Sequence, residues 1–243
     1  MNAASPAVAA SQRPRRRWLR VLLCCVVAAI AWAAFDLYVP AHASMRDFDP
    51  HSVGRLETAM WRSYYDRHPV RLFAELAATL RTQYHFRMVR AWAGALYGAR
   101  AAVVFQRGHG REEYERALPD LRRFYALIRE QSDSPFQVEN AARLELEWWI
   151  VHRQRAQHPP GDLEAALAAL QAEVYQTSAD RFREHAKDRA EAMLIRDQRA
   201  AAGTLNEDDW RRIGELLDQS WTSLWAAVQQ EPEMPVPNAV SSE

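Results

Sequence analysis

Cysteine is nearly absent from this chain of 243 residues, and its two copies, Cys24 and Cys25, are adjacent within the first apolar segment. The chain after residue 43 therefore has no disulfide framework, no cysteine nucleophile and no thiolate metal site. Glycine is also scarce, with eight copies. The sequence contains no glycine-rich phosphate loop and no Gly-x-Ser-x-Gly nucleophile turn, so the common signatures of phosphate-binding and hydrolytic enzymes are missing.

Neither sign of charge is in excess, because the chain has 31 basic and 31 acidic residues. A balanced surface gives no overall field that would attract nucleic acid or an anionic substrate. Lys187 is the only lysine. Arginine in place of lysine, together with abundant alanine, indicates a GC-rich bacterial genome. Because the charges balance, we expect no nucleic-acid partner.

Strand signals are missing as well, since no stretch alternates apolar and polar residues convincingly. The composition is rich in Ala, Leu, Arg and Glu, and apolar residues recur at helical spacing, as in the stripe Val53, Leu56, Met60, Trp61 and Tyr64. The sequence predicts an all-α protein: an N-terminal apolar helix followed by a bundle of about eight helices.

The N-terminus carries a basic cluster, RPRRRWLR (13–20), followed by fifteen uncharged residues, VLLCCVVAAIAWAAF (21–35). With Trp18 and Tyr38 at its ends, segment 18–39 is long enough to cross a bilayer of about 30 Å. The preceding arginines place residues 1–17 in the cytoplasm and the body outside. We expect a single-pass protein of the bacterial inner membrane with a periplasmic body. The alternative is a signal peptide cleaved near residue 43, since Ala41-His42-Ala43 resembles a cleavage site.

The body contains an internal match between its two halves. RLETAMW (55–61) is similar to RLELEWW (143–149), and three further blocks recur in the same order with small insertions. This pattern predicts two tandem four-helix repeats, 50–131 and 136–229. The proline-rich residues 230–243 are predicted to form a disordered tail.

The glutamate of the recurring Arg-Leu-Glu lies on an apolar helix face in both copies. A carboxylate on such a face must be paired or protonated, because a bare buried charge is too costly. Two arginines also lie on apolar stripes: Arg100 among Leu96, Tyr97, Val103 and Val104, and Arg189 among Phe182, Ala186, Ala190 and Met193. We therefore predict one structural ion pair per repeat, Glu57 with Arg100 and Glu145 with Arg189.

A metal site is the alternative use of these carboxylates. Tyr64 lies seven residues after Glu57, and His152 lies seven residues after Glu145. If the repeats pack about a pseudo-twofold axis, these four side chains would converge and bind Fe, Mn or Zn. The Glu-x-x-His motif of di-iron bundles is missing, however. The main expectation is no cofactor.

Nine tryptophans are present, and they are densest at Trp148, Trp149, Trp221 and Trp225. At helical spacing they are favoured as core residues, with a partner or ligand surface as the alternative. Together these features predict a non-enzymatic, membrane-tethered accessory or scaffold protein. It would dock a protein partner in a groove between the repeats. The competing hypothesis is a helical-bundle enzyme with a metal or cofactor site there.

Overall fold

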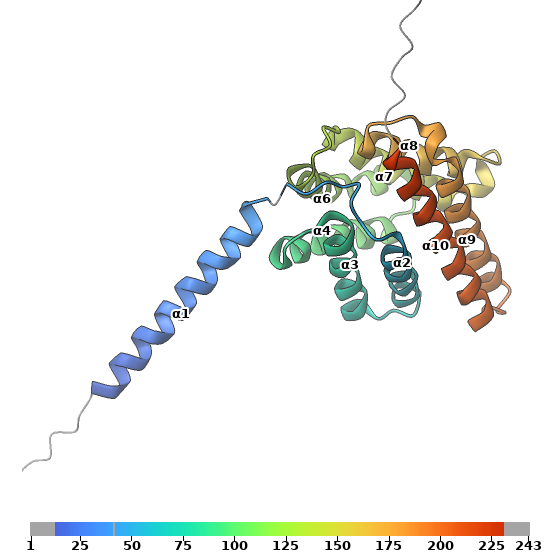
Figure 1. Ribbon diagram of the computed structural model, residues 1–243. Coiled ribbons are helices and arrows are strands. Elements are labelled where there is room, and N and C mark those ends of the chain that lie inside the picture. Colours follow the sequence, from blue (N-terminus) through green and yellow to red (C-terminus); the bar gives the residue numbers. More distant parts are fainter. Residues whose placement is uncertain (1–12, 41, 231–243) are drawn as a thin grey trace, which may run out of the picture. The chain divides into compact units, whose positions relative to one another are not determined.

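The computed structural model describes residues 13–40 and 42–230, and nearly all of them lie in helices or the turns between helices (Figure 1). The predicted all-α class is confirmed. No strand occurs within these ranges, where extended pairing is limited to one isolated bridge between Ala43 and Ser132. Of the predicted cytoplasmic N-terminus and disordered tail, residues 1–12 and 231–243 lie outside the described residues.

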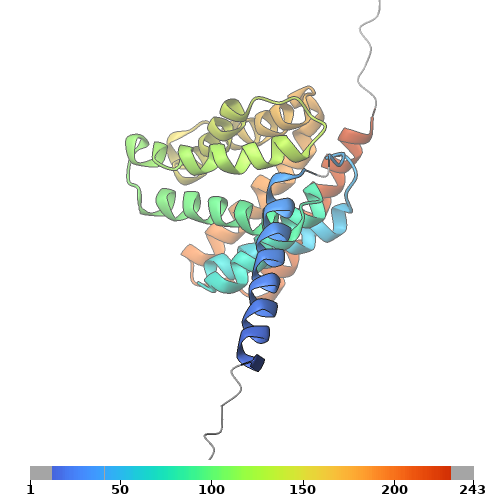
Figure 2. The ribbon, with the colours of Figure 1, turned by 90° about the vertical axis from the view of Figure 1, so that its left-hand side faces the viewer.

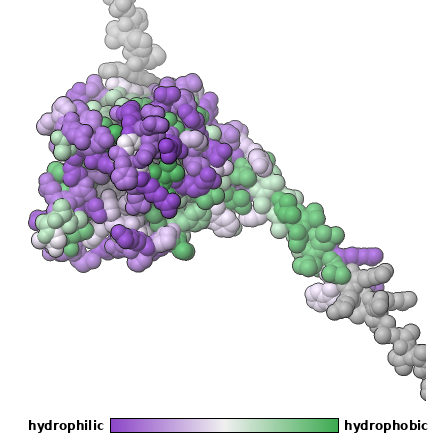
Figure 3. Space-filling view, turned by 180° about the vertical axis from the view of Figure 1, so that it is seen from behind, coloured by the Kyte–Doolittle hydropathy of each residue, from purple (hydrophilic) through white to green (hydrophobic). Residues whose placement is uncertain are grey.

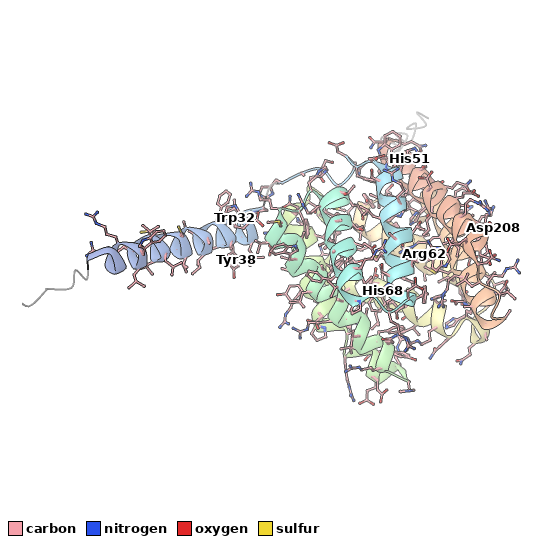
Figure 4. The ribbon with its side chains drawn as sticks, turned by 90° about the horizontal axis from the view of Figure 1, so that it is seen from below. Trp32, Tyr38, His51, Arg62, His68 and Asp208 are labelled. Carbon is pink, nitrogen blue, oxygen red and sulfur yellow. The ribbon has the colours of Figure 1, made fainter. Side chains whose placement is uncertain are left out.

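Helix α1 (Arg13–Tyr38) belongs to a unit that is separate from the body, which begins at Pro40. Its stretch Arg17–Tyr38 is long and apolar enough to cross a membrane, and a signal sequence has the same properties. Apolar side chains predominate on the side of α1 that Figure 3 shows, and Trp32 and Tyr38 project from the helix (Figure 4). The helix begins earlier than hydropathy predicted, because arginines continue the backbone hydrogen bonding without contributing apolar surface.

The described body contains nine α-helices, eight of them with fourteen or more residues, and two short 3₁₀ turns. In chain order these elements are α2 (Pro50–Tyr65), α3 (Pro69–Tyr84), α4 (Met88–Arg107), α5 (Arg111–Glu115), α6 (Leu118–Gln131), α7 (Val138–Arg153), η1 (Arg155–Gln157), α8 (Asp162–Tyr175), η2 (Ala179–Phe182), α9 (Arg183–Ala201) and α10 (Glu207–Gln229).

Local chemistry explains several helix starts. Asp49 accepts hydrogen bonds from the backbone N–H groups of His51 and Ser52 at the start of α2. Asn206 and Asp209 form a capping box at the start of α10. Both arrangements satisfy backbone donors that have no partner inside the helix. The starts of α2 and α10 are therefore fixed by side chains that lie within a few residues of each helix start.

The eight longer helices form a closed ring. Each packs against the next along the chain, and α10 packs against α2 (Figures 1 and 2). The closing pair is antiparallel: Nδ1 of His51 lies 2.8 Å from Oδ1 of Asp218, and Arg62 pairs with Glu207 near the other end of α2 (Figure 4). Gly54 lies directly against the α10 backbone, where an added Cβ would be 2.9 Å from the Cα of Asp218.

Helix α4 is turned differently from the sequence prediction. Leu96 and Val103, which we assigned to the core, are 49% and 43% exposed. The buried residues of α4 are small apart from Arg90, and an added Cβ at Gly94 would be 2.8 Å from a methyl group of Leu80. Close approach of α3 therefore selects the small-residue face of α4, and Leu96 and Val103 point outward.

Candidate functional site

The recurring glutamates are the centre of a polar network inside the ring, and Glu57 is the more deeply buried one. Its side chain is 2% exposed and accepts three hydrogen bonds. Trp61 Nε1 donates to it over 3.2 Å, Trp221 Nε1 over 2.5 Å and Arg189 Nη2 over 2.6 Å. One guanidinium thus compensates its charge, and two indoles donate to two further lone pairs.

Glu145 is held by neutral donors. The hydroxyl of Tyr125 donates to Oε2 over 2.7 Å, and Nε1 of Trp149 donates to Oε1 over 2.9 Å. Within the described ranges, no arginine or lysine forms a salt bridge with this carboxylate. The two glutamates therefore differ in charge compensation although their helix positions correspond.

The predicted ion pairs are corrected by this geometry. Arg189 pairs with Glu57 across the ring closure and not with Glu145. Arg100, which is 55% exposed, pairs with Asp120 at 3.2 Å and not with Glu57. The error follows from the orientation of α4, because its close-packed face carries small residues and places Arg100 outside.

The two carboxylate networks share one geometry. Each glutamate accepts a hydrogen bond from the tryptophan four residues later in its own helix. Each also accepts one from an aromatic residue of the helix that precedes it around the ring: Trp221 of α10 for Glu57, and Tyr125 of α6 for Glu145. The networks therefore tie α2 to α10 and α6 to α7.

Tyrosine hydroxyls near these carboxylates stay protonated. Burial raises the pKa of Tyr84 and of Tyr125 well above the usual value, and the negative charge of Glu145 raises both further. Tyr125 is therefore a hydrogen-bond donor throughout the physiological pH range. The tyrosine hydroxyls therefore keep their protons beside the carboxylates, and a network with fixed donors and acceptors suits a structural role.

We expect Tyr125→Phe to destabilise the body by about 1.5–3 kcal/mol, because one oxygen of a charged carboxylate loses its donor. Urea unfolding of the full chain in mild detergent, followed by circular dichroism, measures the change. Tyr114→Phe is the control, since Tyr114 is 3% exposed and its hydroxyl has no hydrogen-bond partner in the described part of the chain. Equal losses in both variants would contradict a special role for the Tyr125 hydroxyl.

A second polar cluster lies nearer the C-terminal ends of α2 and α7. Asp197 of α9 is contacted by His152 Nε2 at 3.2 Å, by Arg196 at 2.9 Å and by Arg155. Burial opposes ionisation of Asp197, but the hydrogen bonds from His152, Arg155 and Arg196 outweigh it and hold the pKa of Asp197 well below its usual range. The guanidinium of Arg196 also stacks 3.1 Å from the ring centre of Tyr65. Sequence reasoning missed this cluster because its members come from separate helices and form no motif.

The alternative metal site is not assembled. Among the described residues, no group of three or more His, Cys, Asp or Glu side chains has a geometry that could hold a metal ion. His152 faces Asp197, and both glutamates point at aromatic donors. Tyr64, which is 36% exposed, packs edge-on against Tyr65. The four residues thus serve separate contacts.

The tryptophans divide between core and surface. Trp221 is 5% exposed, which agrees with the favoured core assignment and contradicts only the alternative of a partner surface at this position. Trp148 and Trp149 are partly buried against the core, and Trp148 lies under the Arg189 guanidinium at 5.2 Å. Trp225 is 38% exposed. Donation to Glu57 fixes Trp221 inside, and this need for an indole partner is not visible in helical spacing alone.

His185 is a buried neutral base at the α9–α10 contact. The hydroxyl of Ser220 donates to the backbone oxygen of His185 over 2.9 Å, so the histidine Nδ1–H donates to Ser220 in return. Nε2 has no partner within the described part of the protein. Burial and the nearby Arg189 lower the pKa of His185 to about 3, because protonation would leave a buried N–H unpaired.

Because of His185, we expect the protein to lose stability on acidification. The unfolded histidine titrates near 6.5, so between pH 6.5 and 3 only the unfolded chain binds the extra proton. The contribution of neutral His185 to the free energy of unfolding is fully present above pH 6.5 and falls as the pH is lowered. His185→Asn keeps a donor at the Nδ1 position and removes the titration. From pH 7 to 4.5 we expect the parent to lose roughly 2–3 kcal/mol more than this variant. Urea unfolding at each pH measures the difference, and parallel pH profiles would contradict the prediction.

A hollow on the surface is lined by residues of α7, α8 and the following turn, including Leu144, Ala172 and Thr177. Its lining contains neither buried glutamate, so the polar networks are not the walls of this hollow. The chain matches no family model, no curated protein and no solved structure. Both glutamates of the polar networks receive donors from neighbouring helices, so the arrangement positions these helices relative to one another.

Proposed function

We propose that this protein is a membrane-tethered, exported α-helical accessory or scaffold protein that acts through protein–protein interaction. In this proposal α1 stays in the bacterial inner membrane, its N-terminus is cytoplasmic and the helical body is periplasmic. The observation that carries the proposal is a membrane-length apolar helix joined to a separate, compact helical unit. The basic residues before α1 support the orientation.

The polar interior of the body supports the non-catalytic part of the proposal. Glu57 and Glu145 use their oxygens to connect helices around the ring. Such networks contribute more to the specificity of helix pairing than to stability, which fits a structural use of these carboxylates. A rigid ring then presents an outer surface for a partner. We assign this contact to the shallow hollow between α7 and α8, which lies within the second proposed copy and not in the groove between the copies that the sequence led us to expect.

We also propose that the ring arose from duplication of a four-helix unit, with copies at 50–131 and 136–229. Two observations support it: the ordered sequence matches, and the equivalent contacts of Glu57 and Glu145. Each glutamate is contacted by an aromatic residue at the end of the other proposed copy. The α10–α2 contact that closes the ring and the α6–α7 contact between the copies would then be two versions of the same ancestral helix contact.

The tether is tested by expressing the full chain with a C-terminal tag in a bacterial host. We expect the full-length protein of 27.9 kDa to remain in membranes after an alkaline carbonate wash. Protease added to spheroplasts should then digest the body. A shortened, soluble protein that begins after residue 43 would instead identify a cleaved signal peptide. A body protected from protease would contradict the orientation.

The interaction is tested by placing a photo-crosslinking amino acid at Thr177 in the hollow, in the native host. The matched control is Ala74, on the exposed side of α3. We expect a discrete crosslinked product at Thr177 and none at Ala74. Identical products at both positions, or none at either, would count against a partner in this hollow.

A further inference from the structure

Exposed apolar side chains are concentrated on one helix of the body. Of its eight large apolar residues that are exposed, four belong to α4: Met88 (37%), Trp92 (47%), Leu96 (49%) and Val103 (43%). Spacings of four, four and seven residues place them on one side of the helix, and we call them the α4 stripe. The opposite side of α4 is filled by its contacts with α3 and α6. The stripe is therefore a second apolar face with a separate use.

The α4 stripe begins at the end of the body where the chain enters from α1. Ala43 pairs with Ser132, just after α6, and the Met45 N–H donates to Asp133 over 3.3 Å. The first turn of α4 lies at this same end of α6, because Nη1 of Arg90 donates to the Leu127 carbonyl over 3.2 Å. Met88 is two residues before Arg90. The entry point and the start of the stripe thus share one end of the α4–α6 pair.

The covalent link between α1 and this entry point is short. Four residues lie between Tyr38, the last residue of α1, and Ala43, so the link spans five residue steps. A fully extended chain of that length reaches at most about 17 Å. If α1 crosses a bilayer, the entry point of the body therefore stays within about that distance of the end of the membrane-spanning segment.

The composition of the stripe fits the boundary between headgroups and acyl chains. Tryptophan is enriched at that boundary because its ring is apolar while its N–H forms hydrogen bonds. Met, Leu and Val supply apolar area at helical spacing, as in helices that lie flat on membranes. Arg100 lies four residues from Leu96 and pairs with Asp120, but its side chain is 55% exposed, so its free N–H groups remain open to a lipid phosphate.

We propose that the α4 stripe rests on the surface of the membrane that α1 crosses, with Trp92 and Leu96 in the interface. This contact holds the body against the bilayer in one orientation. The inference rests on the proposed function, since it requires a retained α1. In this arrangement the body binds the membrane surface as well as being tethered to it by α1. The α7–α8 side of the ring stays available for a partner.

The test uses the full chain in vesicles of phosphatidylethanolamine and phosphatidylglycerol that contain a lipid-borne fluorescence quencher. Cys24 and Cys25 are replaced by serine, and a single cysteine at Leu96→Cys carries an environment-sensitive dye. Leu194→Cys is the control, because Leu194 is 40% exposed on α9, which lies across the ring from α4. We expect blue-shifted emission and at least threefold stronger quenching at position 96 than at position 194.

A third sample separates failure of the inference from failure of the tether. It carries the dye on the native Cys24 of α1, with Cys25 replaced by serine. Quenching at position 24 with equal, weak quenching at 96 and 194 would overturn the α4 contact and leave the anchor intact. Weak quenching at position 24 would overturn the anchor itself. A blue shift at position 96 that lipid quenchers do not affect would mean that protein, such as a second copy, covers the stripe, and would also overturn the proposal.

Discussion

Arg189→Met is expected to lower the free energy of unfolding by about 3–5 kcal/mol, because it leaves the Glu57 carboxylate buried without its cation. The side chain of Glu57 is 2% exposed, so water cannot replace the lost guanidinium. The two indole donors remain, but neither carries charge. Urea unfolding of the full chain in mild detergent, followed by circular dichroism, measures the loss.

Two controls distinguish loss of the buried pair from loss of an arginine. Arg100→Met removes a pair whose arginine is 55% exposed, and solvent screening limits that effect to about 0–1 kcal/mol. Glu57→Gln combined with Arg189→Met removes both charges and should restore at least half of the stability. If Arg100→Met were as damaging as Arg189→Met, or if the double variant were the least stable, the buried pair would not explain the effect.

Gly54→Ala is expected to destabilise the ring closure by about 1–3 kcal/mol. The new Cβ would lie 2.9 Å from the Cα of Asp218 and 3.3 Å from the Leu217 carbonyl oxygen. Both are backbone atoms of α10, which cannot rotate away as a side chain can. Helices α2 and α10 must therefore separate, which weakens the contacts that join the two ends of the body. Thermal unfolding of the full chain measures the loss.

Gly214→Ala is the matched control on the facing helix. Its Cβ would lie 3.5 Å from the Thr58 methyl group, which is ordinary van der Waals contact. Alanine favours the helix by about 0.5–1 kcal/mol over glycine, so this variant should be neutral or more stable. Equal destabilisation by both substitutions would mean that the closeness of α2 and α10 does not decide the outcome.

Much of the fold could be predicted because its signals are local. Helical periodicity and the lack of strand patterns determine the all-α class, and hydropathy identifies the apolar helix at the N-terminus. Asn206 and Asp209 mark the start of α10 within four residues of sequence. Such features depend on neighbours along the chain, and they are therefore readable without knowing how the helices pack.

The candidate site was predicted only in part, because partner choice is not local. Burial of Glu57 follows from its helix face, but its cation comes from a helix 132 residues later. Arg100 and Arg189 both lie on apolar stripes, and sequence gives no means to decide which stripe turns inward. In α4 the face that contains Gly94 turns inward, because glycine leaves room for the Leu80 side chain. Arg100 lies on another face and therefore points outward.

The sequence by itself determined that this protein is helical, that it begins with a membrane-length apolar helix, and that two glutamates with following tryptophans lie on core faces. These properties arise from periodicity, length and composition along one chain segment at a time. Only the tertiary structure decided that α10 closes on α2, that Arg189 serves Glu57, and that the large apolar face of α4 points outward. Those outcomes depend on which helix surfaces approach most closely, and that is settled by packing between residues far apart in sequence.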